Sequence, residues 1–344
     1  MHGHAPAGSP DTWVFNIEAV STLCIAAWYV FGVFISLGLL PRNRFYDWGN
    51  DWVIPFLLGI FYLGAGYLYQ RHQRIWSLQA WGRYMRREAI VLATPFVAFT
   101  VLTLATNSAL HASPDLSPAN LGLALTVSPV VPVGYFEVLF FIYVLTHTPR
   151  TRGGMVGLLA AALAAKIAVV VCSDAGVADG WPYAVREVPA NWVWFVCGVA
   201  VSFFGLEDWV EKPLVAGAST VTFLALAAVL FGADVRSQLG FFALTALTLL
   251  AFYSLSATRF GTGRQDAFFS FVTRYTMAIW LMHEIVAKLV MAGLAAVGVT
   301  SAGVLGAACV IACYALPVAI MWALSKVWKL GFIVYPSRYL PAGL

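Results

Sequence analysis

The residues best suited to chemistry in this sequence are titratable side chains that interrupt long apolar stretches. Glu137 lies within the apolar run Val133–Tyr143, and His283 precedes Glu284 in another apolar run. Ionisable side chains are costly inside a membrane, which makes each of them a candidate for function. A histidine or a carboxyl group in such a place can transfer protons as a general acid or base. We therefore predict His283 and Glu137 as catalytic residues. A hydrogen bond to a neighbouring helix is the alternative role for Glu137, and a structural role is the alternative for His283.

Other titratable residues in apolar stretches have a structural interpretation beside the functional one. Glu284 and Lys288 are four residues apart, a spacing that places them on one helix face as an ion pair. The amine of Lys166 can reach a membrane interface along its alkyl chain. Glu18 stands near one end of the first apolar stretch, where it can lie at the level of the lipid headgroups.

The segment Arg71–Arg87 is the densest basic cluster, and aromatic residues alternate with its arginines. Such a composition is typical of an amphipathic helix that lies on an anionic membrane surface. Guanidinium groups also bind phosphates through paired hydrogen bonds, so the same cluster is a candidate site for a phosphorylated donor such as a coenzyme A ester.

Membrane-spanning helices must position these side chains. The chain is 61% hydrophobic and 10% charged, whereas ~25% of the residues of a soluble domain are charged. Apolar stretches recur along the chain, and each can cross about 30 Å of hydrocarbon as a helix. The sequence predicts one all-α domain over residues 1–344, a polytopic transmembrane helix bundle of about ten spans. We place the spans near 13–39, 53–70, 89–110, 132–147, 154–172, 191–206, 214–232, 239–257, 267–291 and 301–325.

Charge distribution predicts how this bundle is oriented. Thirteen of the arginine and lysine residues fall in the second, fourth, sixth and eighth connections and the C-terminal tail, against four in the odd-numbered connections. The excess predicts a cytoplasmic location for the first set and for both termini, residues 1–12 and 326–344. The basic residues lie between spans, which argues against a nucleic-acid partner. The five cysteines have no zinc-site or disulfide spacing, so we predict no metal. The assignment of the segment His111–Val131 is left open: its apolar second half is either re-entrant or interfacial.

Several segments, in this order along the chain, resemble those of the acyltransferase-3 family, membrane O-acyltransferases with ten-span cores. They are Pro55–Tyr67, similar to the family's second span; Arg83-Tyr-Met-Arg86, similar to its Arg-x-x-Arg element; Gly134–Tyr143, similar to its aromatic fourth span; Trp192–Gly198, similar to a Phe-Phe-x-x-Gly segment; and Arg274–His283, similar to its Ser-x-x-Ile-Tyr-Leu-x-His signature.

The resemblance implies an integral-membrane acyltransferase of the plasma (inner) membrane. Such an enzyme moves an acyl group from a cytosolic acyl-CoA to a hydroxyl group of a cell-envelope glycan or glycolipid. Arg83 and Arg86 are then expected to bind the donor, with membrane lipids and the envelope acceptor as the other partners.

The sequence departs from the family pattern in the first span. Members carry an arginine and, eleven residues later, a histidine, but Ser21 and Gly32 stand at these places. Neither residue can replace that histidine as a base at neutral pH. This leaves a second hypothesis, an inactive relative that transports or senses a small molecule or lipid, with Glu18, Glu137 and Lys166 as substrate or proton-coupling groups. A third is an assembly partner for another enzyme.

Overall fold

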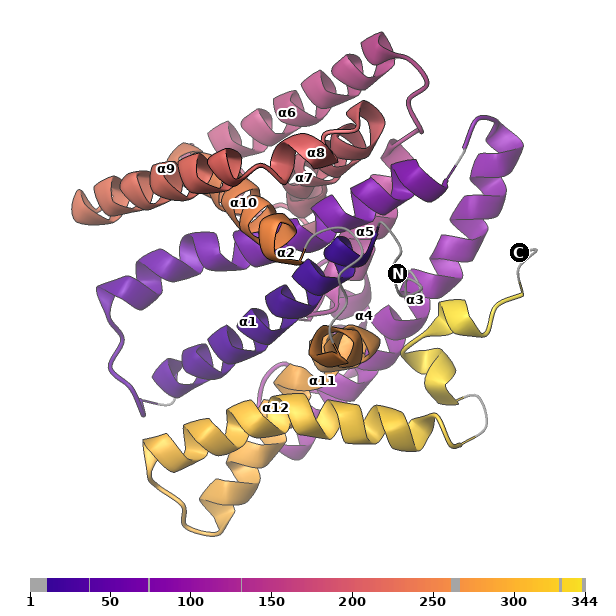
Figure 1. Cartoon of the computed structure of the whole chain (residues 1–344). Coiled ribbons are helices and arrows are strands. Elements are labelled where there is room, and N and C mark those ends of the chain that lie inside the picture. Colours follow the sequence, from indigo (N-terminus) through magenta and orange to yellow (C-terminus); the bar gives the residue numbers. More distant parts are fainter. Residues whose placement is uncertain are drawn as a thin grey trace.

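The computed structural model describes residues 11–36, 38–73, 75–130, 132–260, 267–327 and 330–341. Helices are the only regular elements in these residues (Figure 1). In chain order they are α1 (Thr12–Ser36), α2 (Arg44–His72), α3 (Leu78–Ala109), α4 (Pro118–Thr126), α5 (Gly134–Leu145), α6 (Arg152–Asp174), α7 (Tyr183–Phe204), α8 (Glu207–Val210), α9 (Pro213–Gly232), α10 (Gln238–Phe260), α11 (Ala267–Ala296) and α12 (Ala302–Leu324), followed by the short 3-10 helices η1 (Leu330–Ile333) and η2 (Pro336–Arg338).

Within the described part of the chain, nine helices are long and apolar enough to cross a membrane, and α5 is a shorter apolar helix. The protein is therefore a polytopic helical membrane bundle, as the sequence predicts. Short apolar α5 is 12 residues long, or about 18 Å at 1.5 Å per residue. It is too short to cross the hydrocarbon alone, so the non-helical segment before it must share the crossing with it.

Contacts between distant segments define two ends of the bundle. We call the end that carries the arginine-rich segment Arg71–Arg87 the basic end, and the opposite one the far end. At the basic end, His72 Nε2 lies 2.8 Å from Asp11 Oδ2, and the Ile75 amide donates to Thr148 Oγ1. The connections after α2, α5 and α7 belong to this end, together with residues 330–341 after α12. At the far end, the Tyr183 amide donates to the carbonyl of Val127 at 2.9 Å.

The crossing of α2 and α7 is the tightest helix contact for which glycine is required. A side chain at Gly66 would overlap the carbonyl of Phe195, and one at Gly198 would overlap the carbonyl of Leu63. Small residues allow two helix backbones to approach closely in a membrane, where dispersion contacts replace the hydrophobic effect between helices. These two glycines therefore fix the centre of the bundle.

Capping residues move two helix starts away from their predicted places. The Asn43 side chain accepts a hydrogen bond from the Tyr46 amide at 2.9 Å, so α2 begins before residue 53. Ser77 caps the first turn of α3 in the same way. Arg71 and His72 end α2, and residues 78–87 are the first turns of the long helix α3, so the segment Arg71–Arg87 does not form one amphipathic helix.

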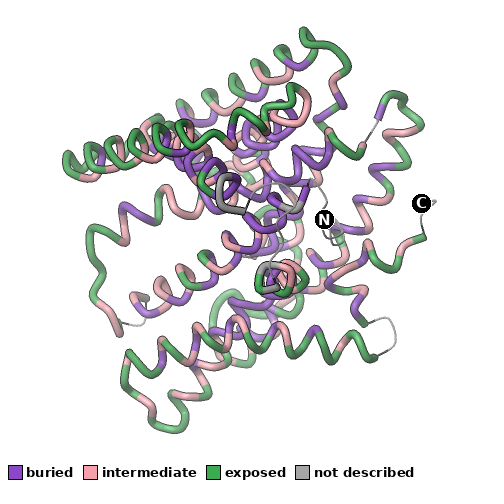
Figure 2. The backbone as a smooth tube through the Cα atoms, in the orientation of Figure 1, coloured by how far each residue is buried: buried purple, intermediate pink, exposed green. Residues whose placement is uncertain are grey.

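Burial is concentrated in the middle of the bundle. Figure 2 shows buried residues gathered where α1, α2 and α7 meet, whereas α6, α9 and α12 are largely exposed or half-buried. The exposed positions of these outer helices carry large apolar side chains such as Val221, Leu224 and Ile311. An apolar exposed surface on long apolar helices is what contact with lipid requires.

Candidate functional site

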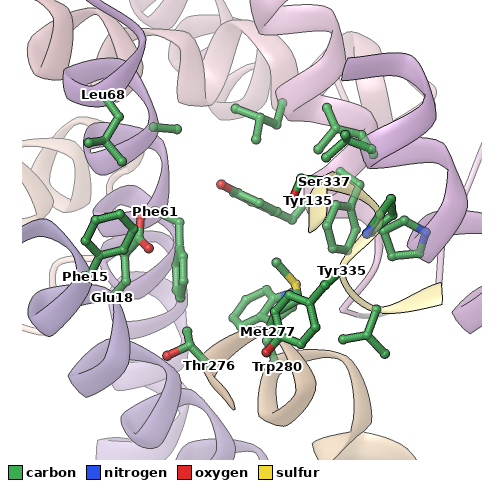
Figure 3. A pocket seen from close by; sticks show the side chains of 18 of the residues that line it. Phe15, Glu18, Phe61, Leu68, Tyr135, Thr276, Met277, Trp280, Tyr335 and Ser337 are labelled. Atoms are coloured by element: carbon green, nitrogen blue, oxygen red, sulfur yellow. The ribbon is translucent and has the colours of Figure 1, made fainter. Parts of the chain in front are cut away.

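A cavity at the basic end penetrates the bundle between α1, α2, α3, α5 and α11. Its volume is about 70 Å³. Aromatic and aliphatic side chains form most of the wall. Glu18 of α1 brings a carboxyl group into it (Figure 3). The depth predicted for Glu18, at the level of the lipid headgroups, stays a prediction.

The C-terminal tail covers the mouth of the basic-end cavity. Tyr335 donates a hydrogen bond to the carbonyl of Arg274 on α11 at 2.8 Å. Burial raises the pKa of the Tyr335 phenol to about 12, so the phenol stays protonated at neutral pH and remains a donor. Arg338 lies over the same ring, with its guanidinium carbon 4.0 Å from the centroid. The tail thus adds one cation to the mouth of the cavity.

A second, larger cavity occupies the far end of the bundle and has a volume of about 520 Å³. The non-helical residues before α5 form part of its wall, including Pro129 and Pro132. Non-helical backbone at membrane depth is tolerated where it lines a cavity or is buried in protein. The far-end cavity therefore explains why α5 is short. Its polar lining includes Tyr29, Tyr46, Asn50, His283 and Glu284.

His283 is held in one tautomer by its own helix. Its Nδ1 atom lies 2.7 Å from the carbonyl oxygen of Trp280 and 3.2 Å from that of Ile279. Carbonyl oxygens only accept, so the neutral ring carries its proton on Nδ1 and keeps Nε2 as the basic nitrogen. The residue is buried, with 1% exposure, and it lines the far-end cavity. The structure thus gives His283 the tautomer that a general base needs.

Glu284 stands beside His283 in the same cavity wall. Its Oε1 atom accepts a hydrogen bond from Lys288 Nζ at 2.6 Å, which confirms the ion pair expected from the spacing. Lys288 also donates to Asn107 Oδ1 of α3 at 2.9 Å. The Tyr29 ring meets the His283 ring edge to face, with the centroids 5.3 Å apart. These contacts fix the carboxyl group and the imidazole ring in one wall.

Three aromatic rings separate the two cavities, and we call Phe61, Tyr135 and Trp280 the aromatic partition. Their centroids lie 5.0 Å apart for Phe61 and Trp280, 5.9 Å for Phe61 and Tyr135, and 6.1 Å for Tyr135 and Trp280. Tyr135 and Trp280 line both cavities. Trp280 is also the residue whose carbonyl accepts from His283. The partition is therefore the point at which the two cavities and the histidine come together.

Gly32 faces the far-end cavity, at the place where the family resemblance puts a histidine. The Tyr46 hydroxyl lies 2.6 Å from where a Cβ atom at position 32 would stand. The Tyr46 ring is stacked on Trp28 with the centroids 5.6 Å apart. A tyrosine from α2 therefore fills the space that a side chain on this turn of α1 would occupy.

A polar cavity adjoins the far-end cavity, between α2, α6, α7 and α10. It has a volume of about 510 Å³ and shares Ile54, Leu58 and Tyr183 with its neighbour. Lys166 lines this polar cavity, and its amine lies 5.5 Å from the centre of the Phe242 ring. The charges in its wall are of both signs, from Asp51, Lys166, Asp179, Arg186 and Glu187.

The other predicted site residues lie apart from His283. Glu137 lines a separate, mostly apolar cavity between α3, α4 and α5, and its Oε2 atom is buried without a hydrogen-bond partner among the described residues. The structure does not bring it together with His283. Arg83 and Arg86 are exposed on the first turns of α3. Leu92 on the same helix lines the basic-end cavity, about 9 Å along the helix axis from Arg86.

Sequence reasoning missed the aromatic residues of the site. Tyr29, Tyr46, Tyr135 and Trp280 stand in apolar helices where aromatic residues are common, so type and spacing do not single them out. Gly32 is the one signal that was available, because the family pattern has a histidine there.

No known protein family, no curated protein and no solved structure matches this chain. The resemblance to the acyltransferase-3 family accordingly rests on the segments quoted above and remains a prediction. Among the described residues, no group of three or more histidine, cysteine, aspartate or glutamate side chains is placed to hold a metal ion.

Proposed function

We propose that this protein is an integral-membrane O-acyltransferase of the acyltransferase-3 type. It transfers an acyl group from a cytosolic acyl-CoA to a hydroxyl group of a cell-envelope glycan or glycolipid. The observation that supports this most is the place of His283. Its tautomer leaves Nε2 as the basic nitrogen, and the residue lines the far-end cavity. Its Nδ1 atom is hydrogen-bonded to the carbonyl of Trp280, a residue that lines both cavities.

The donor enters from the basic end in this proposal. Arg83 and Arg86 hold the phosphates of the acyl-CoA outside the bundle, since guanidinium groups match phosphate oxygens in charge and geometry. The pantetheine arm passes into the basic-end cavity, whose apolar wall accepts the acyl chain. The thioester then reaches the aromatic partition. The basic end faces the cytoplasm, where acyl-CoA is made, in keeping with the excess of positive charge.

The acceptor enters from the far end. The polar cavity holds the sugar portion, and the adjoining far-end cavity brings one hydroxyl group to His283. His283 Nε2 takes the hydroxyl proton while the oxygen attacks the thioester carbonyl. The carbon–sulfur bond breaks, and the imidazolium returns the proton to the leaving thiolate, so the products are the ester and free coenzyme A. Such a base contributes ~10²–10⁴-fold to the rate.

Labelled acyl-CoA tests this proposal in inverted membrane vesicles from cells that produce the protein. Labelled acetyl-CoA and palmitoyl-CoA are supplied outside, and the label is measured in the lipid and glycan fractions. The variant His283→Asn keeps an amide donor near the Nδ1 position but has no basic nitrogen. We expect its rate of acyl transfer to be ~10²–10⁴-fold lower. His147→Asn, exposed at the basic end, is the matched control and should transfer like the unmodified protein. Full transfer by His283→Asn would exclude this histidine as the base.

The position of Glu18 favours a second function, transport or sensing of a small molecule. Cavities on both sides of a thin aromatic partition are the arrangement that alternating access needs, and Glu18 lies in one of them. Purified protein in liposomes distinguishes the two functions. Movement of a labelled solute without any acyl-CoA supports transport, whereas acyl transfer without such movement supports the enzyme.

A further inference from the structure

The polar cavity runs from the far end into the bundle, and Lys166 lies at its inner end. Four residues of α6 line it, Lys166, Val169, Val170 and Ser173, and their spacing places them on one face of that helix. Lys166 is the innermost of the four, because it precedes Asp174, the last residue of α6, by about 12 Å along the helix axis. The wall therefore carries a cationic side chain well inside the bundle.

The Lys166 amine has no direct partner among the described residues. None of their ion pairs or hydrogen bonds includes it. The carboxylate of Glu187 on α7 acts on this amine from a distance. It is bonded elsewhere, because Arg186 Nε donates to Glu187 Oε1 at 2.9 Å and Asn191 Nδ2 donates to Glu187 Oε2 at 3.1 Å. The charge of Glu187 is thus offset on its own helix, and that of Lys166 is not.

The other two carboxylates of the wall stand where water reaches them. Asp51 and Asp179 are exposed, and at ~0.1 M salt the field of an exposed charge falls off over about 10 Å. A cation inside a membrane bundle is screened far less, and it is unfavourable until an anion joins it. An anion at the inner end of the cavity therefore meets the attraction of Lys166 at short range and the repulsion of the exposed carboxylates only weakly.

The rest of the wall narrows the kind of anion that fits. The ring centroids of Trp194 and Phe242 lie 5.3 Å apart, and the centre of the Phe242 ring lies 5.5 Å from the Lys166 amine. Gln238 and Thr245 of α10 add groups that form hydrogen bonds. The volume of about 510 Å³ falls in the range of ~300–1,000 Å³ typical of sites for small organic ligands. A small inorganic anion gains nothing from the rings, whereas a sugar presents an apolar face to a ring and hydroxyl groups to the polar side chains.

We propose that the polar cavity binds an anionic sugar, with Lys166 as the counter-ion of its carboxylate or phosphate group. The sugar ring lies against Trp194, and its hydroxyl groups face the polar side chains of the wall. The polar cavity shares part of its wall with the far-end cavity, which His283 lines. The bound sugar is the acyl acceptor if the proposed function holds, and this assignment alone rests on that function. It is the transported or sensed ligand otherwise.

Equilibrium dialysis of labelled sugars against the purified full-length protein in detergent tests the proposal. The probes are glucuronate and glucose 6-phosphate, which carry the two kinds of anionic group, and glucose, which carries neither. We expect saturable binding of at least one anionic probe, with binding of glucose weaker by roughly tenfold or more. Binding of glucuronate alone assigns the site to a carboxylate, and binding of glucose 6-phosphate alone assigns it to a phosphate. Glucose binding as tight as that of the anionic probes, or no binding of either anionic probe, would overturn the proposal.

Variants of Lys166 test its part in binding. Lys166→Gln keeps much of the side-chain length and removes the charge, so we expect the affinity for the anionic probe to fall roughly tenfold or more. Lys166→Arg keeps the charge and should retain most of the affinity. Lys212→Gln is the matched control, because Lys212 is exposed at the basic end, and it should bind like the unmodified protein. Equal binding by Lys166→Gln and the unmodified protein would exclude Lys166 as the counter-ion.

A carboxylate placed beside Lys166 gives a second test that keeps the amine. Val170 follows Lys166 by four residues and lines the same cavity, so Val170→Glu puts an anion where it can pair with the amine. We expect Val170→Glu to bind the anionic probe roughly tenfold more weakly than Val170→Gln, which has the same shape without the charge. Equal affinities in the two folded variants would count against the site. His283→Asn separates this proposal from the proposed enzyme activity, because it should lose acyl transfer and keep sugar binding.

Discussion

At the scale of single residues, backbone carbonyls of α11 set the chemistry of His283. Because Nδ1 is bonded to the carbonyls of Trp280 and Ile279, the ring needs no carboxylate partner to fix its tautomer. The neighbouring Glu284 is bonded to Lys288 instead. The ion pair could be predicted from its spacing. The tautomer could not, because it depends on where the imidazole ring turns within the folded helix.

Gly32 and Tyr46 form a pair whose coupling can be measured. Gly32→His should destabilise the protein by ~1–3 kcal/mol, because the new side chain meets the Tyr46 hydroxyl and forces the ring away from Trp28. Adding Tyr46→Ala opens this space. We therefore expect the double variant to be ~0.5–3 kcal/mol more stable than the sum of the two single effects would give. Thermal unfolding of the four proteins in detergent measures both terms. Strictly additive effects would show that the two residues do not compete for one space.

At the scale of elements, the α2–α7 crossing and the short α5 shape both cavities. The crossing holds together helices that surround the aromatic partition. Helix α5 begins inside the bundle, and its residue Tyr135 belongs to that partition. Apolar length predicted α2 and α7 as spans, but it also predicted a span near 132–147, where the structure has the shorter helix α5. Pro129 and Pro132 lie before the start of α5. Which helices cross closely could not be read from the sequence, since it has 29 glycines and most of them do not lie at a helix crossing.

Alanine substitutions at the crossing test its role. Gly66→Ala and Gly198→Ala each place a methyl group against a backbone carbonyl, which cannot turn aside as a side chain can. We expect each to lower the stability by ~1–3 kcal/mol or more, with a lower melting temperature in detergent. Gly157→Ala on α6 and Gly217→Ala on α9 have open space around them. These controls should melt at or slightly above the temperature of the unmodified protein, and an equal loss in all four variants would contradict the assigned crossing.

At the scale of the whole molecule, the bundle brings two cavities from opposite ends to one partition. Recurrent apolar stretches predicted about ten spans correctly, because the thickness of the hydrocarbon sets a minimum helix length. The arrangement of those spans was not predictable, since helices this apolar all round do not reveal which side faces lipid. The separation of Glu137 from His283 follows from that arrangement, and so does the opening of Glu18 into a cavity.

Cysteine labelling tests the predicted orientation of the bundle. In a protein without its native cysteines, His147→Cys marks the basic end and Leu116→Cys marks the far end, and both positions are exposed. A membrane-impermeant maleimide added to intact cells should label Leu116→Cys and not His147→Cys, because the charge distribution predicts that the basic end faces the cytoplasm. The reverse pattern would mean that the acyl-CoA path proposed here opens on the wrong side of the membrane.

Binding of coenzyme A and acetyl-CoA to the purified protein, followed by calorimetry in detergent, tests the central claim most directly. The claim predicts dissociation constants in the micromolar range for the unmodified protein. The double variant Arg83→Ala/Arg86→Ala should bind about tenfold more weakly for each lost phosphate contact of ~1.4 kcal/mol. The charge-matched control Arg152→Ala/Lys326→Ala, also exposed at the basic end, should bind normally. Absence of binding to the unmodified protein would contradict an acyl-CoA-dependent enzyme and leave transport or sensing as the function of the two cavities.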